Sequence, residues 1–420
     1  MTQECAGAEH QLNAGTRTSS PQSPYSIRVF RSDEEILTLR HLWEKWAVEP
    51  TSDIDQFLLV CRIRTNVRNP HVIVVSGDEG PVAILAARLE NGKIASSLGY
   101  FASVQFSVRN LSVVYCGLLG RVDDAVVVAL MKSLSGTLKT READVVTLYH
   151  LPPDSPLLAA AMRQVSCLWR DGKPSLNPHW QLMLHDKPEE LRQKIRAKHR
   201  SLVCQKTQKL EKAFPGRVSY HNFETGDDVK GLCAELESVA RLTYQRGLGE
   251  GFMDDADHRE RFELFKRRKT LRARIIRVDN VARAFDVGFL YRDVYYFSET
   301  GYDPTYRAYE MGTLTFLQMI DLLIEEGVTK FDFGFGDAHY KQRFGNHLTH
   351  EATMRLYSPS TKGFFIRWCI GIADSVSALV RRLVKRLGFV DRLKKAWRQR
   401  LSGEIKNLPL VPFGICGFVW

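Results

Sequence analysis

A helix that starts directly after a strand is the feature of this sequence best suited to bind an anion. Two expected antiparallel strands end in FSETGYDP, and the run YEMGT at 309–313 then opens a helix. The first turn of a helix has backbone N–H groups without intrahelical acceptors and carries the positive end of the helix dipole. It therefore favours an anion such as pyrophosphate. Gly312 has no Cβ and lets a phosphate approach, and Arg307 supplies a charge-assisted contact. A lone glycine at such a position also serves as an ordinary turn.

A second run of chemically active residues follows that helix. The sequence FDFGFGDAHYKQRFG, from Phe331 to Gly345, predicts a strand, a glycine turn and a short helix. The three phenylalanines at alternate positions are typical of a core strand. The DFG triplet has no kinase context, because no glycine-rich ATP loop and no H-R-D loop accompany it. Taken alone, the run is also consistent with a purely structural turn.

The same run resembles the D-F-G-x-G-D-x-x-Y-K-x-x-F signature of CelD-like acetyltransferases, which belong to the GNAT superfamily and accompany cellulose and exopolysaccharide biosynthesis. The stretch SETGYDPTYRAYEMGTLTFLQMIDLLIEEGVTKFDFG is similar to the family segment just before the signature, and LRQKIRAKHRSLVCQKTQKLEKA to its basic helix upstream. The resemblance covers about residues 25–360 and is specific over 285–346. FemAB-type transferases, which are related, carry two GNAT-like domains in one chain.

The resemblance implies an acyl-CoA donor, most simply acetyl-CoA, and no metal. In GNAT folds two parallel strands splay apart and the pantetheine arm enters between them, which here are the FSETGY and FDFGF strands. Pyrophosphate would meet the backbone of Met311, Gly312 and Thr313, with Arg307 beside it. The sequence departs from the common Q/R-x-x-G-x-G/A pattern, since it has only Tyr309-x-x-Gly312-Thr313.

The resemblance also implies candidates for proton transfer. An attacking amine or hydroxyl needs a base, and the departing thiolate needs an acid. Tyr340 matches the signature tyrosine and is the expected acid, and Lys341 is expected to hold phosphate or the developing oxyanion. Glu299 is the preferred base because it should face the splay. Asp337 is a catalytic candidate whose alternative role is a helix cap.

Two further residues of this run remain open as bases. Asp332 is either a base or a strand-end carboxylate paired with Lys341 or Arg343. His339 stands where the family often has acidic residues or proline, and it is an alternative base or simply a surface residue.

The order of predicted elements indicates an α/β (α+β) protein of two tandem GNAT-like domains, with mostly antiparallel mixed sheets flanked by helices. The 420 residues suit two domains of ordinary size. We expect a disordered lead-in over 1–24, an N-terminal GNAT-like domain over 25–175, a C-terminal acyltransferase domain over 176–361, and a basic amphipathic helical tail over 362–420. The eight cysteines form no C-x-x-C pair, which argues against a structural zinc site and favours a reducing, cytoplasmic compartment.

The positive charge is concentrated in three segments. The net charge is +11, while residues 192–217, 266–277 and 362–420 carry +8, +7 and +9, so the rest of the chain carries −13. Without interleaved aromatic residues or a reading motif, this distribution does not favour nucleic acid. The basic helix near 188–213 is either a solvated face or a groove for an anionic acceptor. The tail, with an apolar stripe through Val376 and Val380, suits an anionic membrane surface or a protein partner.

These observations favour an acyl-CoA-dependent N- or O-acyltransferase that acts on a sugar or polysaccharide precursor in exopolysaccharide or cell-envelope biosynthesis. We expect it in the cytoplasm, peripheral on the inner face of the membrane. One alternative is a FemAB-like aminoacyl transferase, which should show a longer helical arm. The other is a membrane-associated adaptor whose GNAT fold has lost catalysis.

Overall fold

The computed structural model describes residues 25–98, 102–184, 189–243, 246 and 251–386. The sequence-based expectations for residues 1–24 and 387–420 lie outside this range. We call residues 25–164 the N-terminal half and residues 175–344 the C-terminal half. The elements of the N-terminal half are β1 Ser26–Phe30, α1 Asp33–Leu37, α2 Arg40–Trp46, η1 Pro50–Ser52, α3 Ile54–Ile63, β2 Val67–Gly77, β3 Gly80–Leu98, β4 Ala102–Gly120, α4 Asp124–Lys139, β5 Val145–Leu151 and α5 Pro156–Gln164.

The C-terminal half has a similar order of elements and is followed by one strand and one helix. Its elements are β6 Ser175–Met183, α6 Glu189–Ala213, β7 Val218–Asn222, α7 Val229–Ala240, α9 Ala256–Arg267, β8 Leu271–Val278, β9 Val281–Tyr291, β10 Val294–Tyr302, η2 Pro304–Tyr309, α10 Met311–Glu325, β11 Lys330–Phe335 and α11 His339–Phe344. The chain continues with β12 His347–Tyr357 and α12 Thr361–Arg386.

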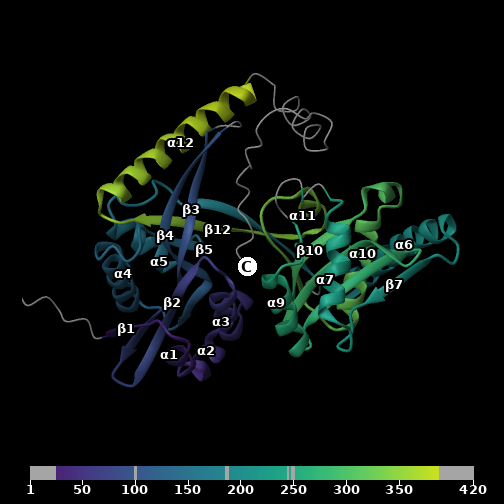
Figure 1. The fold of residues 1–420 in the computed structure, drawn as a ribbon, viewed down its shortest axis with the longest axis horizontal. Coiled ribbons are helices and arrows are strands. Elements are labelled where there is room, and N and C mark those ends of the chain that lie inside the picture. The colour runs from purple at the N-terminus through teal and green to yellow at the C-terminus, as the bar shows by residue number, and fades with distance from the viewer. Residues whose placement is uncertain (1–24, 99–101, 185–188, 244–245, 247–250, 387–420) are drawn as a thin grey trace, which may run out of the picture.

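The described strands form one twelve-stranded sheet in the order β1-β2-β3-β4-β5-β12-β6-β11-β10-β9-β8-β7 (Figure 1). Most neighbours are antiparallel, whereas β4 with β5 and β10 with β11 are parallel. The α/β fold class predicted from the sequence is confirmed. β12 pairs with β5 on one side and β6 on the other, so a late strand joins the two halves into one sheet.

The first helix shows how local sequence sets an element and also ends it. Ser32 caps α1 by accepting from the N–H of Glu35, and the Glu35 carboxylate accepts from the N–H of Arg31. The run EEILTLRHLWEKWA that follows this capping box predicts one continuous helix. The structure instead divides it into α1 and α2, because the Thr38 hydroxyl bonds back to the Glu35 carbonyl at 2.6 Å and the helix ends there.

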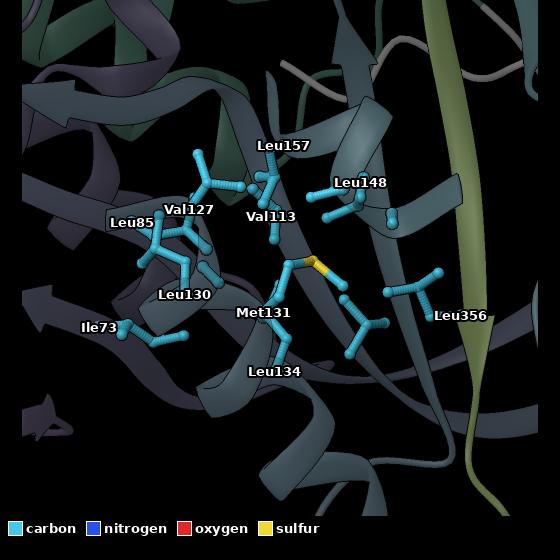
Figure 2. Close-up of a cluster of buried hydrophobic side chains, with 14 of the residues drawn as sticks. Ile73, Leu85, Val113, Val127, Leu130, Met131, Leu134, Leu148, Leu157 and Leu356 are labelled. Carbon is cyan, nitrogen blue, oxygen red and sulfur yellow. The ribbon is translucent and has the colours of Figure 1, made fainter. Parts of the chain in front are cut away.

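Both faces of the N-terminal half are covered by helices. On one face α4 and α5 pack on β2–β5, and Figure 2 shows Leu130, Met131 and Leu134 of α4 among the strand residues. Leu356 of β12 belongs to the same cluster. This core is therefore complete only when β12, which follows the C-terminal half, returns to it. The opposite face carries α1–α3, with Trp43 and Phe57 fully buried.

The C-terminal half is also a sheet between two helix layers. On one face, α7 and α9 pack on β8 and β9 around Phe262 and Phe285. On the other, α10 packs on Tyr295, Phe331 and Phe333 from β10 and β11. The register places α4, α5 and α10 on one side of the common sheet and α1–α3, α7 and α9 on the other. The central strands β12, β6 and β11 therefore lie between the two helix groups.

Candidate active site

The parallel strands β10 and β11 pair for only three residues and then diverge. The register runs from Val294 opposite Lys330 to Tyr296 opposite Asp332. Beyond that point β10 contains a bulge between Phe297 and Glu299, which shifts its register against β9. A bulge re-aims the strand and its side chains. The structure thus contains the splay that the resemblance implies, between the two strands that the sequence identifies.

The helix that follows β10 begins without a side-chain cap. Its N-cap residue, Glu310, adopts the left-handed conformation with φ +52° and makes no capping bond, and the first turn contains no acid. A Cβ added to Gly312 would lie 3.0 Å from Cδ1 of Tyr302, so the turn is closely packed at this glycine. The backbone N–H groups of Met311, Gly312 and Thr313 belong to this first turn, where an anion is favoured.

Lysines of the basic helix α6 border the same turn. Lys206 Nζ lies 2.6 Å from the Glu310 carboxylate, and Lys209 Nζ donates to the Ala308 carbonyl at 2.7 Å. The ion pair with Lys206 lowers the pKa of Glu310. Arg307 is exposed nearby and Gly312 and Thr313 are half-buried, whereas Met311 is fully buried. The turn is therefore electropositive in spite of Glu310.

Tyr340 lies against both diverging strands. Its ring makes edge contacts with Phe297 of β10 and Phe333 of β11, each at 6.2 Å between centroids. These residues belong to the cluster under α10, so Tyr340 stands on the same side of the sheet as the first turn of α10. This placement fits the expected acid.

Lys341 does not fit the role expected from the sequence. Its side chain is 2% exposed, and its ammonium donates to the carbonyls of Gly334 at 3.3 Å and Phe335 at 2.6 Å. Burial lowers its pKa to about 8. The ammonium is directed at the end of β11, so it holds this strand in place rather than a phosphate.

The aspartates of the signature are also placed differently from expectation. Asp337 does not cap α11, because Ala338 is the N-cap; its carboxylate accepts from Trp180 at 3.1 Å and Gln342 at 2.7 Å. Asp332 bonds to the β6 side chains His179 and Gln181, and its negative charge also acts on the buried Lys341. His339 is exposed on α11. These two aspartates therefore hold β6 to the β11–α11 turn.

Glu299 lies on the other side of the sheet from Tyr340. It is opposite Val287 in the β9 ladder, and Val287 packs with α7. Its side chain is half-buried. Directly opposite residues in an antiparallel pair share a face. Glu299 therefore shares the face of Tyr296, next to the bulge, and its role as the base stays a prediction.

A polar cluster that the sequence does not predict lies on this face where the strands diverge. We define it as Glu49, His179, Tyr296, Asp332 and Glu351. The Tyr296 hydroxyl donates to Glu49 Oε2 at 2.6 Å. Burial raises the pKa of Glu49 to about 7, with Asp332 adding to the shift. Glu49 remains partly exposed, so a carboxylate with the pKa of a general base is accessible beside the splay.

His179 organises the centre of the polar cluster. Its Nε2 lies 2.8 and 2.9 Å from the two oxygens of Asp332, and its Nδ1 lies 3.7 Å from Glu351. Burial opposes the charged ring, but the bond to Asp332 prevails and raises the pKa of His179 to about 9. Gln181 and the Gly334 N–H also bond Asp332, at 2.8 and 2.7 Å. The result is a fixed, charged pair between β6 and β11.

Aromatic rings from the N-terminal half close the other edge of the cluster. His150 stacks on Phe335 with 3.6 Å between centroids, and Tyr115 meets Phe335 edge-on at 5.0 Å. Burial and the charge on His179 lower the pKa of His150 to about 4, so it is neutral. Tyr115 and His150 also line a pocket with Thr51, Gln56, Arg88, Ser112 and Tyr149.

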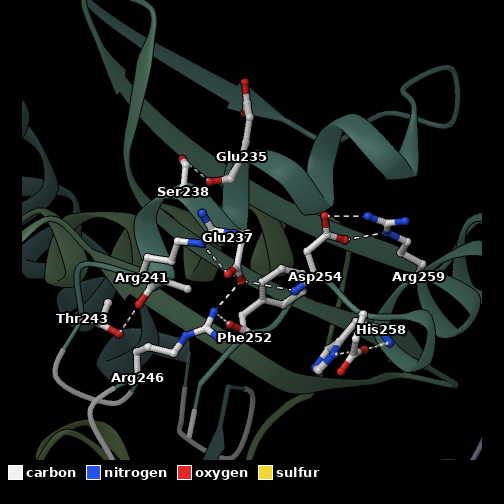
Figure 3. Close-up of polar contacts among 12 residues, drawn as sticks. Glu235, Glu237, Ser238, Arg241, Thr243, Arg246, Phe252, Asp254, His258 and Arg259 are labelled. Carbon is white, nitrogen blue, oxygen red and sulfur yellow. Dashed lines mark hydrogen bonds and ion pairs between the residues drawn. The ribbon is translucent and has the colours of Figure 1, made fainter. Parts of the chain in front are cut away.

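Bonds between the halves fix the segment that carries Glu49. Arg292 donates to the Ala47 carbonyl at 2.6 Å, and Arg268 bonds Asp53 at 3.0 Å. In the C-terminal half, the segment that follows α7 is fixed to that helix, since Glu237 accepts from the backbone N–H of Asp254 and Arg246 donates to the Phe252 carbonyl (Figure 3). No signal within the sequence marks Glu49, because its partner is 247 residues away.

No group of three or more His, Cys, Asp or Glu side chains suited to a metal occurs within the part of the chain that the structure describes. Within the polar cluster, hydrogen bonds from Tyr296, His179 and Gln181 hold the carboxylates of Glu49 and Asp332.

Comparison with known proteins identifies the domain that contains the splay. Residues 197–342 match the acetyltransferase (GNAT) domain family. A search of curated proteins finds no match. Among solved structures, a tandem GNAT protein from the clavulanic acid biosynthesis pathway is 12% identical and has a TM-score of 0.46, with 80% of this chain and 99% of that chain covered.

Two other structures align over a similar share of the chain. FemX is 10% identical with a TM-score of 0.48, covering 79% of this chain and 97% of its own. A GCN5-related N-acetyltransferase from Sphaerobacter thermophilus is 13% identical with a TM-score of 0.41, covering 80% and 97%. The family match spans the β10/β11 splay and the first turn of α10, and this match supports an acyltransferase.

Proposed function

We propose that the protein transfers an acyl group, most simply acetyl, from CoA to an amine or hydroxyl of a sugar, as a step in exopolysaccharide or cell-envelope biosynthesis. The observation that carries the chemistry is Glu49, held by Tyr296 at 2.6 Å on the open side of the β10/β11 splay. A partly exposed carboxylate with a pKa near 7 can take a proton from an acceptor at neutral pH.

The donor side of the proposal rests on the opposite face of the sheet. The uncapped first turn of α10 offers backbone N–H groups to the CoA pyrophosphate, and Lys206 and Lys209 add positive charge. The thioester would then reach the acceptor face through the gap between β10 and β11. Tyr340, which touches both strands, stands on the donor side of that gap.

The proposed reaction uses one base and one acid. Glu49 removes the proton from the acceptor nitrogen or oxygen as that atom forms a bond to the acyl carbon. The carbon–sulfur bond then breaks, and Tyr340 gives its phenolic proton to the departing thiolate. Tyr296 keeps the Glu49 carboxylate oriented, and His179 holds Asp332 so that β11 keeps its divergent path. Glu299 lies on the same face and is the second candidate for the base.

The choice of a sugar as acceptor is supported by two features. Hydroxyl-rich ligands require several fixed donors and acceptors, and the acceptor face presents Glu49, Gln181, Glu351 and Tyr115 close together. The sequence also resembles acetyltransferases that accompany polysaccharide biosynthesis over residues 285–346. Neither feature distinguishes N- from O-acylation.

The test separates donor from acceptor. Calorimetry with acetyl-CoA should show one site per chain, and thiol release should then be measured with amino sugars, nucleotide sugars and short oligosaccharides beside simple amines and peptides. Faster thiol release with a sugar supports the proposal. Absence of acetyl-CoA binding would refute the donor, and turnover with peptides or amines alone would refute the sugar acceptor while leaving acyl transfer intact.

A further inference from the structure

Helix α12 presents two apolar faces: one is buried, and the other is exposed, although Phe365 at its start meets Phe106 of β4 edge-on at 5.9 Å between centroids. Ile366 and Ile370 are 1% exposed and pack with Ile94 of β3 and Val108 of β4. In Figure 1 the helix lies along the long β3/β4 hairpin, away from the C-terminal half. A helix with a single buried stripe should be polar on its other side, but the other side of α12 is apolar.

The outward face of α12 is a continuous apolar row. Its exposed members follow one another at intervals of three or four residues, which places them on one side of the helix. They are Phe365 (55% exposed), Trp368 (56%), Ile372 (42%), Val376 (40%) and Leu379 (57%). We call these five residues the outer row. Exposed apolar surface of this extent beside polar residues marks an interaction site.

The charges of the helix indicate what the outer row meets. Its one acid, Asp374, is bonded to Ser96 of the hairpin at 2.6 Å, and Lys362 pairs with Asp144. Arg382 is exposed. The sequence from 381 to 400 has nine Lys or Arg and one acid, which is a charge of +8. An apolar, aromatic row followed by dense positive charge is complementary to an anionic lipid surface.

We propose that α12 lies in the plane of an anionic membrane surface, with the outer row inserted among the lipids. By length and composition the window Thr361–Val380, of mean hydropathy 1.5, is also sufficient to cross a membrane. Crossing would require the helix to leave the hairpin and carry Arg367 and Asp374 into the lipid interior, which is costly. Lying flat keeps both residues bonded to the protein, Arg367 to the Arg170 carbonyl.

The test is vesicle flotation of the full chain with the double variant Phe365→Ser/Trp368→Ser. The wild type should float with vesicles of phosphatidylglycerol and phosphatidylcholine, less with phosphatidylcholine alone, and less at high salt. The double variant should bind at least roughly tenfold more weakly, because two large apolar side chains no longer insert. Leu176→Ser is the matched control: Leu176 is 58% exposed on β6 and should leave flotation unchanged.

A second variant separates loss of membrane insertion from misfolding of the double variant. Trp368→Phe keeps an apolar ring, so flotation should be retained while the quenching of tryptophan fluorescence by brominated lipid falls. Equal flotation of the double variant would overturn the proposal, as would a wild type that does not float. A wild-type dimer that the double variant dissociates would show that the outer row is a subunit interface. Resistance to alkaline carbonate extraction would show that the helix spans the membrane.

Discussion

The β4/β5 pair of the N-terminal half and the β10/β11 pair of the C-terminal half are both parallel, diverge after a few residues, and have a following helix, α4 or α10. The register of β4 with β5 covers four residues, from Asn110 to Val113, and that of β10 with β11 covers three. The two helix starts differ. Asp123 caps α4 by accepting from the Val126 N–H at 2.8 Å, and Asp124 adds a second acid. α10 has neither a side-chain cap nor an acid in its first turn.

The side chains beyond the paired segments of the two parallel strand pairs, where the strands diverge, differ as well. In the N-terminal half, Tyr115 and His150 lie beyond the paired segment and contact Phe335 of β11. The same half extends Glu49 to Tyr296 of β10. Under the proposed function, this difference implies that the C-terminal half binds the donor. The N-terminal half, whose α4 start is capped by Asp123, would instead supply residues to the acceptor side.

The largest expected effect is that of Glu49→Gln. If the N-terminal half supplies the base, the substitution should lower kcat by roughly 10²–10⁴-fold with little change in acetyl-CoA affinity. Wild-type activity should rise with pH through about 7, where Glu49 loses its proton, and the variant should lack this rise.

Glu44→Gln is the control for that variant, because Glu44 lies on α2, has a side chain that is 53% exposed and pairs with Arg40 of the same helix. Normal turnover by Glu49→Gln, combined with loss of turnover in Glu299→Gln, would assign the base to the C-terminal half. This result would contradict the proposal that the N-terminal half supplies the base.

His179→Gln should lower the free energy of unfolding, and not only the rate of turnover. Removing one partner of a buried ion pair costs about 3–5 kcal/mol, because Asp332 is left charged and buried. The folded pKa of His179 is about 9, above its unfolded value of about 6.5. Its contribution is therefore complete below pH 6.5 and is lost as the pH rises toward 9. Thermal unfolding from pH 6 to 9.5 should show this decline in the wild type and not in the variant.

The partly exposed pair His221–Asp227, at 2.9 Å, supplies the control for His179. His221→Gln should cost at most about 1 kcal/mol, as expected for a surface pair. Equal losses in the two variants would show that the central pair is no more important to stability than a surface one.

Matched substitutions at the second residue of each helix test the donor site. Gly312→Glu places a carboxylate in the first turn of α10 and should weaken acetyl-CoA binding at least roughly tenfold, by repulsion and by blocking the phosphates. Ala125→Glu makes the same change in α4 and should have no effect on binding. Calorimetry checks both, and unchanged binding in Gly312→Glu would remove the pyrophosphate from this turn.

The sequence predicts the elements around the donor site because their signals are local. The helix start at Gly312, the strand at Phe331–Phe335 and the basic helix ending at Ala213 all occur where periodicity and turn residues place them. Tyr340 lies on the predicted short helix, where it contacts both diverging strands, and its role as the acid stays a prediction.

The acceptor side is determined by pairing across the chain, which no local pattern contains. Glu49 meets Tyr296, and His179 meets Asp332, across 247 and 153 residues. The position of β12 between β5 and β6 is likewise a matter of tertiary pairing. Lys341 illustrates the resulting error: its charge favours a phosphate role from sequence, but burial under β11 directs it to backbone carbonyls.

The smallest expected effect concerns the cap of α4. Asp123→Ala should cost about 1 kcal/mol of stability, since the Val126 N–H loses its acceptor, while Asp123→Ser should retain most of it. Neither variant should gain a second acetyl-CoA site, because Tyr115 and His150 occupy the opening beyond β4 and β5. Titration of Asp123→Ser/Asp124→Ser separates two explanations for this half. A stoichiometry that remains at one means that the opening itself is filled. A second site would mean that the two carboxylates alone repel the donor. The N-terminal half would then retain the rest of a donor-binding site.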